Sequence, residues 1–395
     1  MKILSLSCKS FRSFRALGGW NPADLNVVIG PNSSGKSNLL RCIDFMAASA
    51  QGRLAETVQQ AGGLDPMIWD GDGDDLGISM ECSPVNPGNG PLDYDLRLSR
   101  LGKGGDYSIG FEQLASFKRV QQGSAGKPFK FIDRAGSRVR VFDDSEKAVV
   151  APEDEVPVAE TMVSLAKGPF TANRVISQFR AQLAGFSVYQ DFHTNREAAV
   201  RQPSITRMEK RVNADGQNLI SVLHTLYTGD RDFKNEVNDA MRAAFGADFE
   251  ELVFPPASDQ RIQLRIRWRS LRREQSAAEL SDGTLRFLFL LTVLATPDPA
   301  PVIAIDEPET GLHPSMLPII AEYAVEASKR AQVILTTHSP QLLDAFSETR
   351  PQTTVVYREE GETHLRVLED AKLAEWLEEY SLGSLFRTGE LEEMS

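Results

Sequence analysis

Cysteine and histidine are both scarce in this chain of 395 residues, which has 3 cysteines and 5 histidines. The cysteines, Cys8, Cys42 and Cys82, are odd in number, and no two of them form a C-x-x-C pair. This pattern excludes a disulfide-stabilised scaffold and argues against a zinc knuckle, because both need paired or closely spaced cysteines. Unpaired thiols indicate a reducing compartment, and we expect the cytoplasm.

Long apolar runs are also missing. The longest, Phe287–Ala295, follows an arginine and is far shorter than the about 20 residues that a membrane-spanning helix needs. The N-terminal sequence MKILSLSCKSF is too short and too polar for a signal peptide. We therefore expect no membrane span and no membrane partner.

An excess of basic charge is the third absence. Lysine and arginine number 43 and aspartate and glutamate 55, and the net charge of −12 disfavours nucleic-acid binding over the whole surface. Residues 351–395 hold 4 of the basic and 11 of the acidic residues, so the rest of the chain is nearly balanced and can still carry a local basic surface. The length predicts two or three domains of about 150 residues each.

A phosphate-binding loop is the main feature of the N-terminal part. An apolar strand is expected at 25–29 and a helix from about residue 36, and the sequence between them fits G-x-x-x-x-G-K-[ST]. The candidate phosphate-binding residues are Gly30, Pro31, Asn32, Ser33, Ser34, Gly35, Lys36, Ser37 and Asn38.

The residue types of this loop explain its chemistry. Gly30 and Gly35 allow the backbone to curl so that successive N–H groups face an anion, and the N-terminus of the following helix adds positive charge. Lys36 can reach the β- and γ-phosphates of a nucleotide, and the Ser37 hydroxyl can ligate Mg²⁺.

Three further motifs follow in the last third of the chain. Ser281 and Gly283 open a strongly apolar helix, and such a helix start also suits an anion. An apolar strand at 301–305 ends in Asp306 and Glu307, which suit a magnesium ligand and a general base. A second apolar strand at 333–337 precedes His338, which can contact a γ-phosphate or the attacking water. Each motif is weak alone, but the carboxyl ends of parallel strands are where α/β sheets bind ligands.

Together these motifs carry a family resemblance. The segments GPNSSGKS, LSDGTLR, VIAIDEPETGLHP and TTHS resemble the ABC-type ATPase head of SMC, RecF-type and OLD-family proteins. The chain is most similar to the stand-alone AAA family ATPases of that group, which lack a nuclease domain. Only 57 residues follow His338, too few for the nuclease domain of OLD proteins.

The resemblance implies a site shared between two chains. Two heads are expected to pack head-to-tail around two ATP molecules, each held by Lys36 and Ser37 of one chain and by the signature residues Ser281 and Gly283 of the other. The resemblance assigns Mg²⁺ to Ser37 and Asp306, the general base to Glu307 and the switch histidine to His338. The expected catalytic residues are therefore Glu307, His338 and Lys36. Thr310 and Gly311 are expected at the dimer seam, and Asp282 stands where the signature usually has glycine.

The expected fold is a mixed α/β head of the P-loop, ABC-type class, with flanking helices, an antiparallel β layer and an inserted, mainly helical lobe. Residues 1–150 form the N-terminal half of the head with the β layer, 151–258 the inserted lobe, and 259–395 the C-terminal half with a short acidic tail. No sustained heptads are present, so a long coiled-coil arm is not expected.

Two stretches allow a second interpretation. The acidic patch at 70–75 mimics a calcium loop with Glu81 at its twelfth position, but Asp75 stands where such a loop needs glycine, and we favour a plain acidic loop. The alternating stretch 261–269, RIQLRIRWR, predicts a strand whose arginine face either contacts a nucleic-acid backbone or is neutralised by nearby acids. The acidic overall charge favours the second.

The expected function is that of an ATP-hydrolysing head that dimerises around ATP, or forms a higher oligomer. It would act in DNA maintenance or anti-phage defence, with DNA and a separately encoded nuclease or toxin as expected partners. The alternative is a nucleotide sensor of low turnover that regulates a partner. A transporter subunit is disfavoured, because Lys36 and Ser281 are 245 positions apart.

Overall fold

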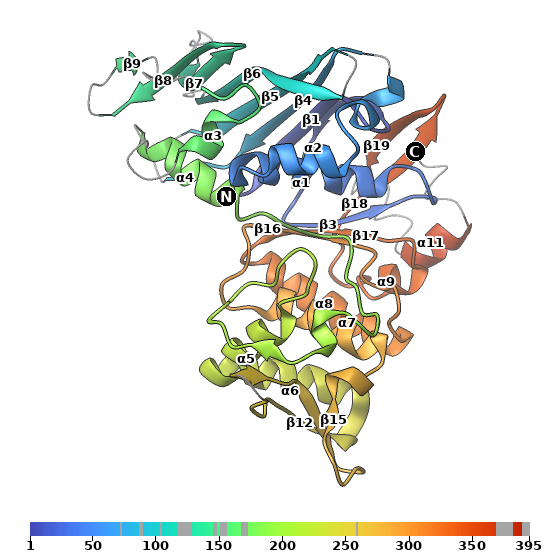
Figure 1. Cartoon of the computed structure of the whole chain (residues 1–395). Helices are drawn as coiled ribbons and strands as arrows, with labels where there is room; N and C mark the ends of the chain where they lie inside the picture. The colour runs from blue at the N-terminus through green and yellow to red at the C-terminus, as the bar shows by residue number, and fades with distance from the viewer. Residues whose placement is uncertain are drawn as a thin grey trace. The chain divides into compact units, whose positions relative to one another are not determined.

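The computed structural model describes residues 1–71, 73–86, 90–102, 105–116, 128–144, 148–150, 156–166, 173–257, 260–368 and 382–388 (Figure 1). The chain forms two compact units, each built from separate segments. Unit 1 comprises Met1–Ala23, Gly30–Phe186 and Val356–Arg366, and unit 2 comprises Asp24–Ile29, Ser187–Val355 and Val367–Ser395.

Unit 1 contains an eight-stranded antiparallel sheet with the strand order β2-β1-β4-β5-β6-β7-β8-β9. Buried and less buried residues alternate along β4 and β5, which is the pattern of strands that cover a core with one face. The sheet confirms the predicted antiparallel layer. Its strands are β1 (Ile3–Phe11), β2 (Phe14–Trp20), β4 (Asp75–Cys82), β5 (Leu92–Leu101), β6 (Asp106–Ser116), β7 (Phe129–Ala135), β8 (Arg138–Asp143) and β9 (Ala148–Val150).

The helices of unit 1 are α1 (Lys36–Gln51), α2 (Leu54–Gln60), α3 (Met162–Leu165) and α4 (Arg174–Leu183), with short 3-10 turns η1 (Asp65–Met67) and η2 (Trp69–Gly71). Helix α1 follows the predicted phosphate loop and is buried along most of its length. Its Phe45 packs edge-on against Phe11 of β1. The helix ends at Gly52, whose left-handed backbone caps it.

The second sheet supplies the parallel strands of unit 2, whereas Val356–Arg366 of its last two strands belong to unit 1. The whole six-stranded sheet has the order β10-β16-β17-β3-β18-β19, and the neighbouring strands from β10 to β18 are parallel. Strands β3, β16 and β17 are almost fully buried, which explains their continuous apolar runs. The strands are β3 (Leu25–Ile29), β10 (Ser187–Tyr189), β16 (Val302–Asp306), β17 (Gln332–Thr336), β18 (Gln352–Glu359) and β19 (Glu362–Val367).

Helices surround this sheet in unit 2. They are α5 (Leu219–Gly229), α6 (Arg231–Phe245), α7 (Asp282–Ala295), α8 (Leu317–Ser328), α9 (Pro340–Asp344) and α11 (Leu382–Thr388), with η4 (Ala199–Arg201), η5 (Gly246–Asp248), η6 (Ala277–Glu279) and η7 (Pro314–Met316). Helix α7 is buried almost all round, as its apolar sequence predicts. None of the helices in the described part of the chain has both the length and the apolar character that crossing a membrane requires.

The predicted continuous strand at 261–269 is wrong. The structure divides it into β13 (Arg261–Ile262), which pairs with β11 (Ser204–Ile205), and β14 (Arg265–Trp268), which lies between β12 (Phe249–Val253) and β15 (Gln275–Ser276). The break arises because the two halves join different small sheets. Arg267 forms ion pairs with Glu251 and Glu274. The interpretation that the sequence favoured, an arginine face neutralised by nearby acids, is therefore confirmed for Arg267.

Two other predictions concern the acidic patch and the domain boundaries. Glu81 lies inside β4 opposite Asp93 of β5, so it belongs to a strand and not to a calcium loop. The predicted three-part division stays a prediction. Its boundary at 151 adjoins residues outside the described part of the chain, and its boundary at 258 falls among them.

Candidate active site

The predicted phosphate loop has a backbone that only glycine can adopt at two positions. Gly30 follows β3 directly and has a φ of +146°, and a Cβ there would lie 2.1 Å from the carbonyl oxygen of Val356. Gly35 has a φ of +114°, and its Cβ would lie 2.5 Å from the hydroxyl of Thr363. The loop is therefore curled tightly against β18 and β19 within unit 1, as an anion-binding loop requires.

The Lys36 side chain binds back to the first two residues of this loop. Its ammonium group donates to the carbonyl oxygens of Gly30, at 2.8 Å, and of Pro31, at 3.1 Å, and the residue is only 5% exposed. A buried ammonium group favours negative charge nearby, so an anionic phosphate fits beside it. The Ser34 hydroxyl is buried without a hydrogen-bond partner among the described residues, which also fits a loop shaped for a ligand.

Neighbouring side chains hold the loop in place. Thr363 of β19 donates its hydroxyl to the Ser34 carbonyl oxygen at 2.7 Å, and Asn38 donates its amide to the Ser13 hydroxyl at 2.8 Å. Ser37 is the second residue of α1. Thr363 is a support that the sequence did not reveal, because it lies more than three hundred residues from the loop.

The predicted catalytic acids lie at the carboxyl edge of the parallel sheet in unit 2. Asp306 ends β16 and is paired in register with Thr336, the last residue of β17, which donates its hydroxyl to the Asp306 carboxylate. His338 follows β17, and its Nδ1 lies 3.2 Å from the Glu307 carboxylate. The structure therefore brings Asp306, Glu307 and His338 together.

Glu307 has an unusual backbone. Its φ is +46°, a left-handed conformation that few non-glycine residues adopt. Its N–H donates to the hydroxyl and the carbonyl of Thr336, at 3.1 and 3.2 Å, and its carbonyl accepts from Arg286 at 3.0 Å. These hydrogen bonds, at the N–H and at the carbonyl of the residue, hold the turn in this conformation. Strained backbone of this kind clusters at functional sites.

Glu309 is a site residue that was not predicted. Its side chain is 9% exposed and accepts from the Thr337 hydroxyl at 2.6 Å and from the His338 N–H at 3.1 Å. Its second oxygen is buried and has no hydrogen-bond partner within the described ranges. A carboxylate with one unpaired oxygen beside the predicted base and histidine fits a water or ligand at this edge. Its place two residues after Glu307 was the only available signal.

Arg286 brings positive charge to this edge. Burial lowers the pKa of its guanidinium, and the carboxylates of Glu309, Glu307 and Asp306 act in the opposite direction. It lies on α7, one turn after the predicted signature, and therefore links that helix to the Glu307 turn. This role could not be predicted, because nothing local marks a half-buried arginine that bonds to a distant carbonyl.

The predicted signature residues begin α7. Ser281 is the N-cap residue, and its hydroxyl accepts from the Thr284 N–H at 3.1 Å. Gly283 lies against the loop after β16, and a Cβ on it would stand 2.6 Å from the Gly311 carbonyl oxygen. The start of α7 and the loop around Gly311 therefore fit closely within one chain. Binding of nucleotide by Ser281 and Gly283 stays a prediction.

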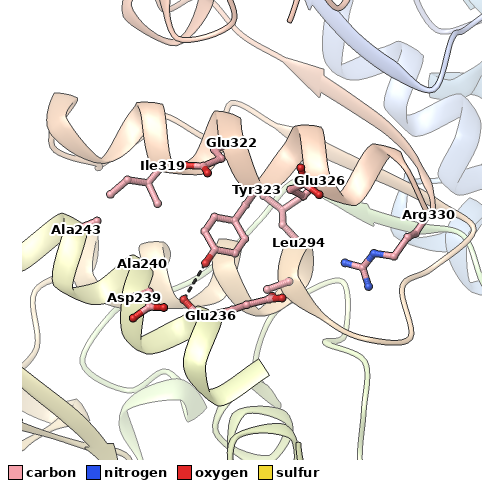
Figure 2. A pocket seen from close by; sticks show the side chains of 11 residues that line it. Glu236, Asp239, Ala240, Ala243, Leu294, Ile319, Glu322, Tyr323, Glu326 and Arg330 are labelled. Carbon is pink, nitrogen blue, oxygen red and sulfur yellow. Dashed lines mark hydrogen bonds between the residues drawn. The ribbon is translucent and has the colours of Figure 1, made fainter. Parts of the chain in front are cut away.

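A separate cavity of about 440 Å³ lies between α6 and α8 in unit 2 (Figure 2). Its lining includes Glu236, Asp239, Glu322 and Glu326, and Tyr323 donates to the Glu236 carbonyl oxygen across it at 2.8 Å. None of the predicted site residues lines this cavity, and its carboxylates would repel phosphate. It is therefore not part of the candidate site.

Comparison with solved structures defines the class of fold. The chain is similar to a structure described as the SmcHead bound to the C-winged helix domain of ScpA, with a TM-score of 0.60, 13% identity, and coverage of 95% of this chain and 100% of the other. It is also similar to an Smc head domain with an extended coiled coil bound to the C-terminal domain of ScpA derived from Pyrococcus furiosus, with a TM-score of 0.54, 12% identity, and coverage of 95% and 98%. The fold is that of an SMC-like, P-loop ATPase head.

The family follows from the sequence match. A family model described as "AAA domain, putative AbiEii toxin, Type IV TA system" matches residues 25–344, which is most of the chain. The protein belongs to this family of AAA domains, and the predicted resemblance to an ABC-type AAA family ATPase is confirmed. No match was found among curated proteins.

Proposed function

We propose that this protein binds ATP at residues 30–38 and hydrolyses it with the residues at the carboxyl edge of its parallel sheet. The observation that carries the proposal is the strand order. Strands β16, β17 and β3 are adjacent and parallel, so the acids, the histidine and the start of the phosphate loop all leave the sheet at one edge.

The residues of the phosphate loop would hold the triphosphate. Lys36 would exchange its two carbonyl partners for phosphate oxygens, and the N-terminus of α1 would face the same negative charge. The loop needs no large rearrangement for this, because Gly30 and Gly35 are already curled.

Ser37 and Asp306 would hold Mg²⁺, which would supply positive charge against the negative charge of the phosphates. No group of three or more histidine, cysteine or acidic side chains within the described ranges is arranged to hold a metal. A site completed by phosphate oxygens and water agrees with how proteins bind this ion.

Glu307 would take the proton of the attacking water, and His338 would orient that water or contact the γ-phosphate. The 3.2 Å contact between their side chains places an imidazole within hydrogen-bond distance of the proposed base. Glu309 orients His338 by accepting its backbone N–H. Together these contacts preorganise the edge for an in-line attack.

We further propose that two chains dimerise around ATP, with Ser281 and Gly283 contacting the nucleotide held by the other copy. The similar SMC heads are described as bound to ScpA domains, which supports a separately encoded partner here. The matched family description names a toxin and a toxin–antitoxin system, which supports a role in defence with a nuclease or toxin effector. DNA maintenance is the second setting that we consider.

Glu307→Gln tests the proposal. The variant is expected to bind ATP like the unchanged protein, to hydrolyse it at least about 100-fold more slowly, and to accumulate as a dimer with ATP and Mg²⁺. Single-turnover hydrolysis and light scattering after size exclusion measure both properties. An unchanged hydrolysis rate in the variant would remove Glu307 as the base. A very low rate in the unchanged protein that neither DNA nor a partner raises would favour the nucleotide sensor.

A further inference from the structure

The turn before α7 is held by one buried arginine from a distant segment. Arg201, at the end of η4, has a side chain that is only 9% exposed. Its Nη1 donates to the carbonyl oxygens of Leu280, at 2.7 Å, and Ala277, at 3.2 Å, and its Nε donates to the Thr194 carbonyl oxygen at 2.6 Å. The guanidinium therefore fixes the backbone on the N-terminal side of Ser281.

The same guanidinium also pairs with the residue on the other side of Ser281. Its Nη2 lies 2.5 Å from the carboxylate of Asp282, which is 70% exposed. Hydrogen bonds from the Thr194 side chain and from Arg201 lower the pKa of Asp282, so this carboxylate is ionised at neutral pH. Asp282 is the residue that departs from the signature pattern, and it brings negative charge to the turn that is proposed to meet a triphosphate.

We propose that Arg201 is a positioning residue that makes this aspartate-containing signature compatible with ATP held by a second copy of the chain. It does so by neutralising the Asp282 carboxylate and by fixing the Leu280 and Ala277 carbonyl groups. The inference rests on the proposed function, because it needs a nucleotide at the dimer seam. Arginine suits the role better than lysine, since its planar fork reaches several acceptors in fixed directions.

The test uses Glu307→Gln as the parent protein, because it accumulates the ATP-bound dimer. Arg201→Gln in this parent is expected to raise the protein concentration needed for half-dimerisation by at least about tenfold, while nucleotide binding by the monomer is unchanged. Adding Asp282→Asn is expected to restore most of the dimer, because it removes the exposed negative charge. The defect is also expected to shrink at about 0.5 M salt, since salt screens charge repulsion.

Arg242→Gln is the matched control. Arg242 pairs with Asp239 on α6, so its loss removes a surface ion pair without touching the signature turn, and dimerisation is expected to stay as in the parent. Thermal unfolding of each variant checks that the fold is kept. If Arg201→Gln does not fold, Asp282→Asn alone is tested, and a dimer at least as tight as that of the parent is expected.

Each other outcome overturns the proposal. Normal dimerisation of Arg201→Gln shows that the arginine is dispensable, and a defect that Asp282→Asn does not relieve shows that its role is only structural. A weaker dimer from Asp282→Asn alone shows that the carboxylate helps rather than repels. A parent that binds ATP and stays monomeric overturns the proposed dimer, and this inference with it. The last outcome is distinguishable because it needs no change at Arg201.

Discussion

At the residue scale, the turn at Glu307 combines the proposed general base with a strained backbone. The left-handed conformation of a non-glycine residue costs about 1–2 kcal/mol, and here Thr336 and Arg286 hold it by hydrogen bonds. In this conformation the carboxylate lies 3.2 Å from Nδ1 of His338. The residues that support the turn are therefore expected to affect turnover more than binding.

Arg286→Ala removes the donor that binds the Glu307 carbonyl oxygen. We expect a roughly 10- to 100-fold loss of turnover with little change in ATP affinity, because about 1.4–2.7 kcal/mol of transition-state stabilisation depends on a correctly held base. Steady-state kinetics and equilibrium binding of a fluorescent ATP analogue measure the two effects. Arg330→Ala is the control, since Arg330 likewise donates to a backbone carbonyl, that of Thr296, away from this turn. Equal losses in both variants would contradict the prediction.

Glu309→Gln tests the buried carboxylate beside His338. Both donors to Glu309 bind the same carboxylate oxygen, so the amide oxygen can still accept from both. The NH₂ group then replaces the second, buried oxygen, which has no partner within the described ranges, and it gains no acceptor. We expect about 1–3 kcal/mol lower stability from the unsatisfied groups, together with slower turnover. Chemical denaturation and turnover assays measure these changes. A variant with normal stability would contradict the prediction, because it would show that the buried NH₂ group costs no stability.

The sequence predicted the candidate catalytic and metal-binding residues of the site, whose roles stay predictions, but not the residues that hold them in place. Asp306, Glu307 and His338 were recognised because each follows an apolar strand, which is a local signal. Arg286 and Arg201 act through carbonyl groups of other segments, and a hydrogen bond to a backbone carbonyl leaves no mark in the sequence of either segment.

At the element scale, helix α7 joins the predicted signature to the turn that holds the proposed base. Its first turn packs Gly283 against the Gly311 carbonyl, and its next turn places Arg286 on Glu307. A shift of the helix start would therefore move the loop around Gly311 within the same chain. The helix is a rigid connection between two parts of the proposed machinery.

Gly283→Ala tests this close fit. Helix propensity alone would stabilise the variant by about 1 kcal/mol, but the new Cβ would stand 2.6 Å from the Gly311 carbonyl oxygen. We expect the clash to dominate, with a lower melting temperature and a weaker ATP-dependent dimer. Gly229→Ala at the end of α5 is the control, because its Cβ meets nothing within 4 Å. A stabilised Gly283→Ala variant would show that the loop around Gly311 moves away from the new Cβ at little cost in free energy.

The pairing of β4 with β5 predicts that the stability of the folded protein depends on pH. Glu81 lies opposite Asp93, and burial, then Glu81 and Asp95, raise the pKa of Asp93 to about 6. A raised carboxyl pKa means that the folded state binds the proton more tightly. Stability is therefore lost as the pH rises from about 4 through about 6.

Asp93→Asn is expected to stabilise the protein at about pH 7.5 by about 1 kcal/mol, after allowance for solvent screening. The gain should shrink as the pH falls below about 6 and vanish near about pH 4. Urea denaturation at neutral and at mildly acidic pH measures it, with Asp106→Asn at the exposed start of β6 as the control. A gain that is the same at both values would assign the effect to packing rather than to charge.

Apolar patterning predicted most elements of this fold and also produced its clearest error. It identified β3, β16 and β17, because each of these strands lies in one sheet along its whole length. It predicted β13 and β14 as one strand, because the alternation of apolar and polar residues continues across the point where the pairing partner changes. Strand β10 was not predicted, since Ser187–Tyr189 is too short to show any period.

At the scale of the whole molecule, remote segments interleave within one sheet. Strand β3, near the N-terminus, lies between β17 and β18, which come more than three hundred residues later. The motifs predicted an ABC-type head through their resemblance to that family, and the ends of the apolar strands predicted only that the motifs lie at one edge of a parallel sheet. The division into two compact units of interleaved segments could not be predicted, because it depends on which strands pair across those distances.

A chain that ends at Arg350 tests this dependence. It keeps every residue of the proposed ATP site but lacks β18, so β3 becomes an edge strand and Gly30 loses the neighbouring Val356 carbonyl. We expect an aggregated or unfolded product that binds no ATP, measured by calorimetry and circular dichroism. A chain that ends at Thr388 is the control and should bind normally. Tight ATP binding by the shorter chain would contradict the prediction.

The place of β3 has a consequence for biosynthesis. While the ribosome is still translating the middle of the message, the apolar residues Val27, Val28 and Ile29 have no strand beside them on either side. For most of its synthesis, the nascent chain therefore has an unpaired apolar strand and needs protection from aggregation. We therefore expect the proposed nucleotide binding only after the last strands have emerged, and an interrupted translation product is expected to have no partial activity.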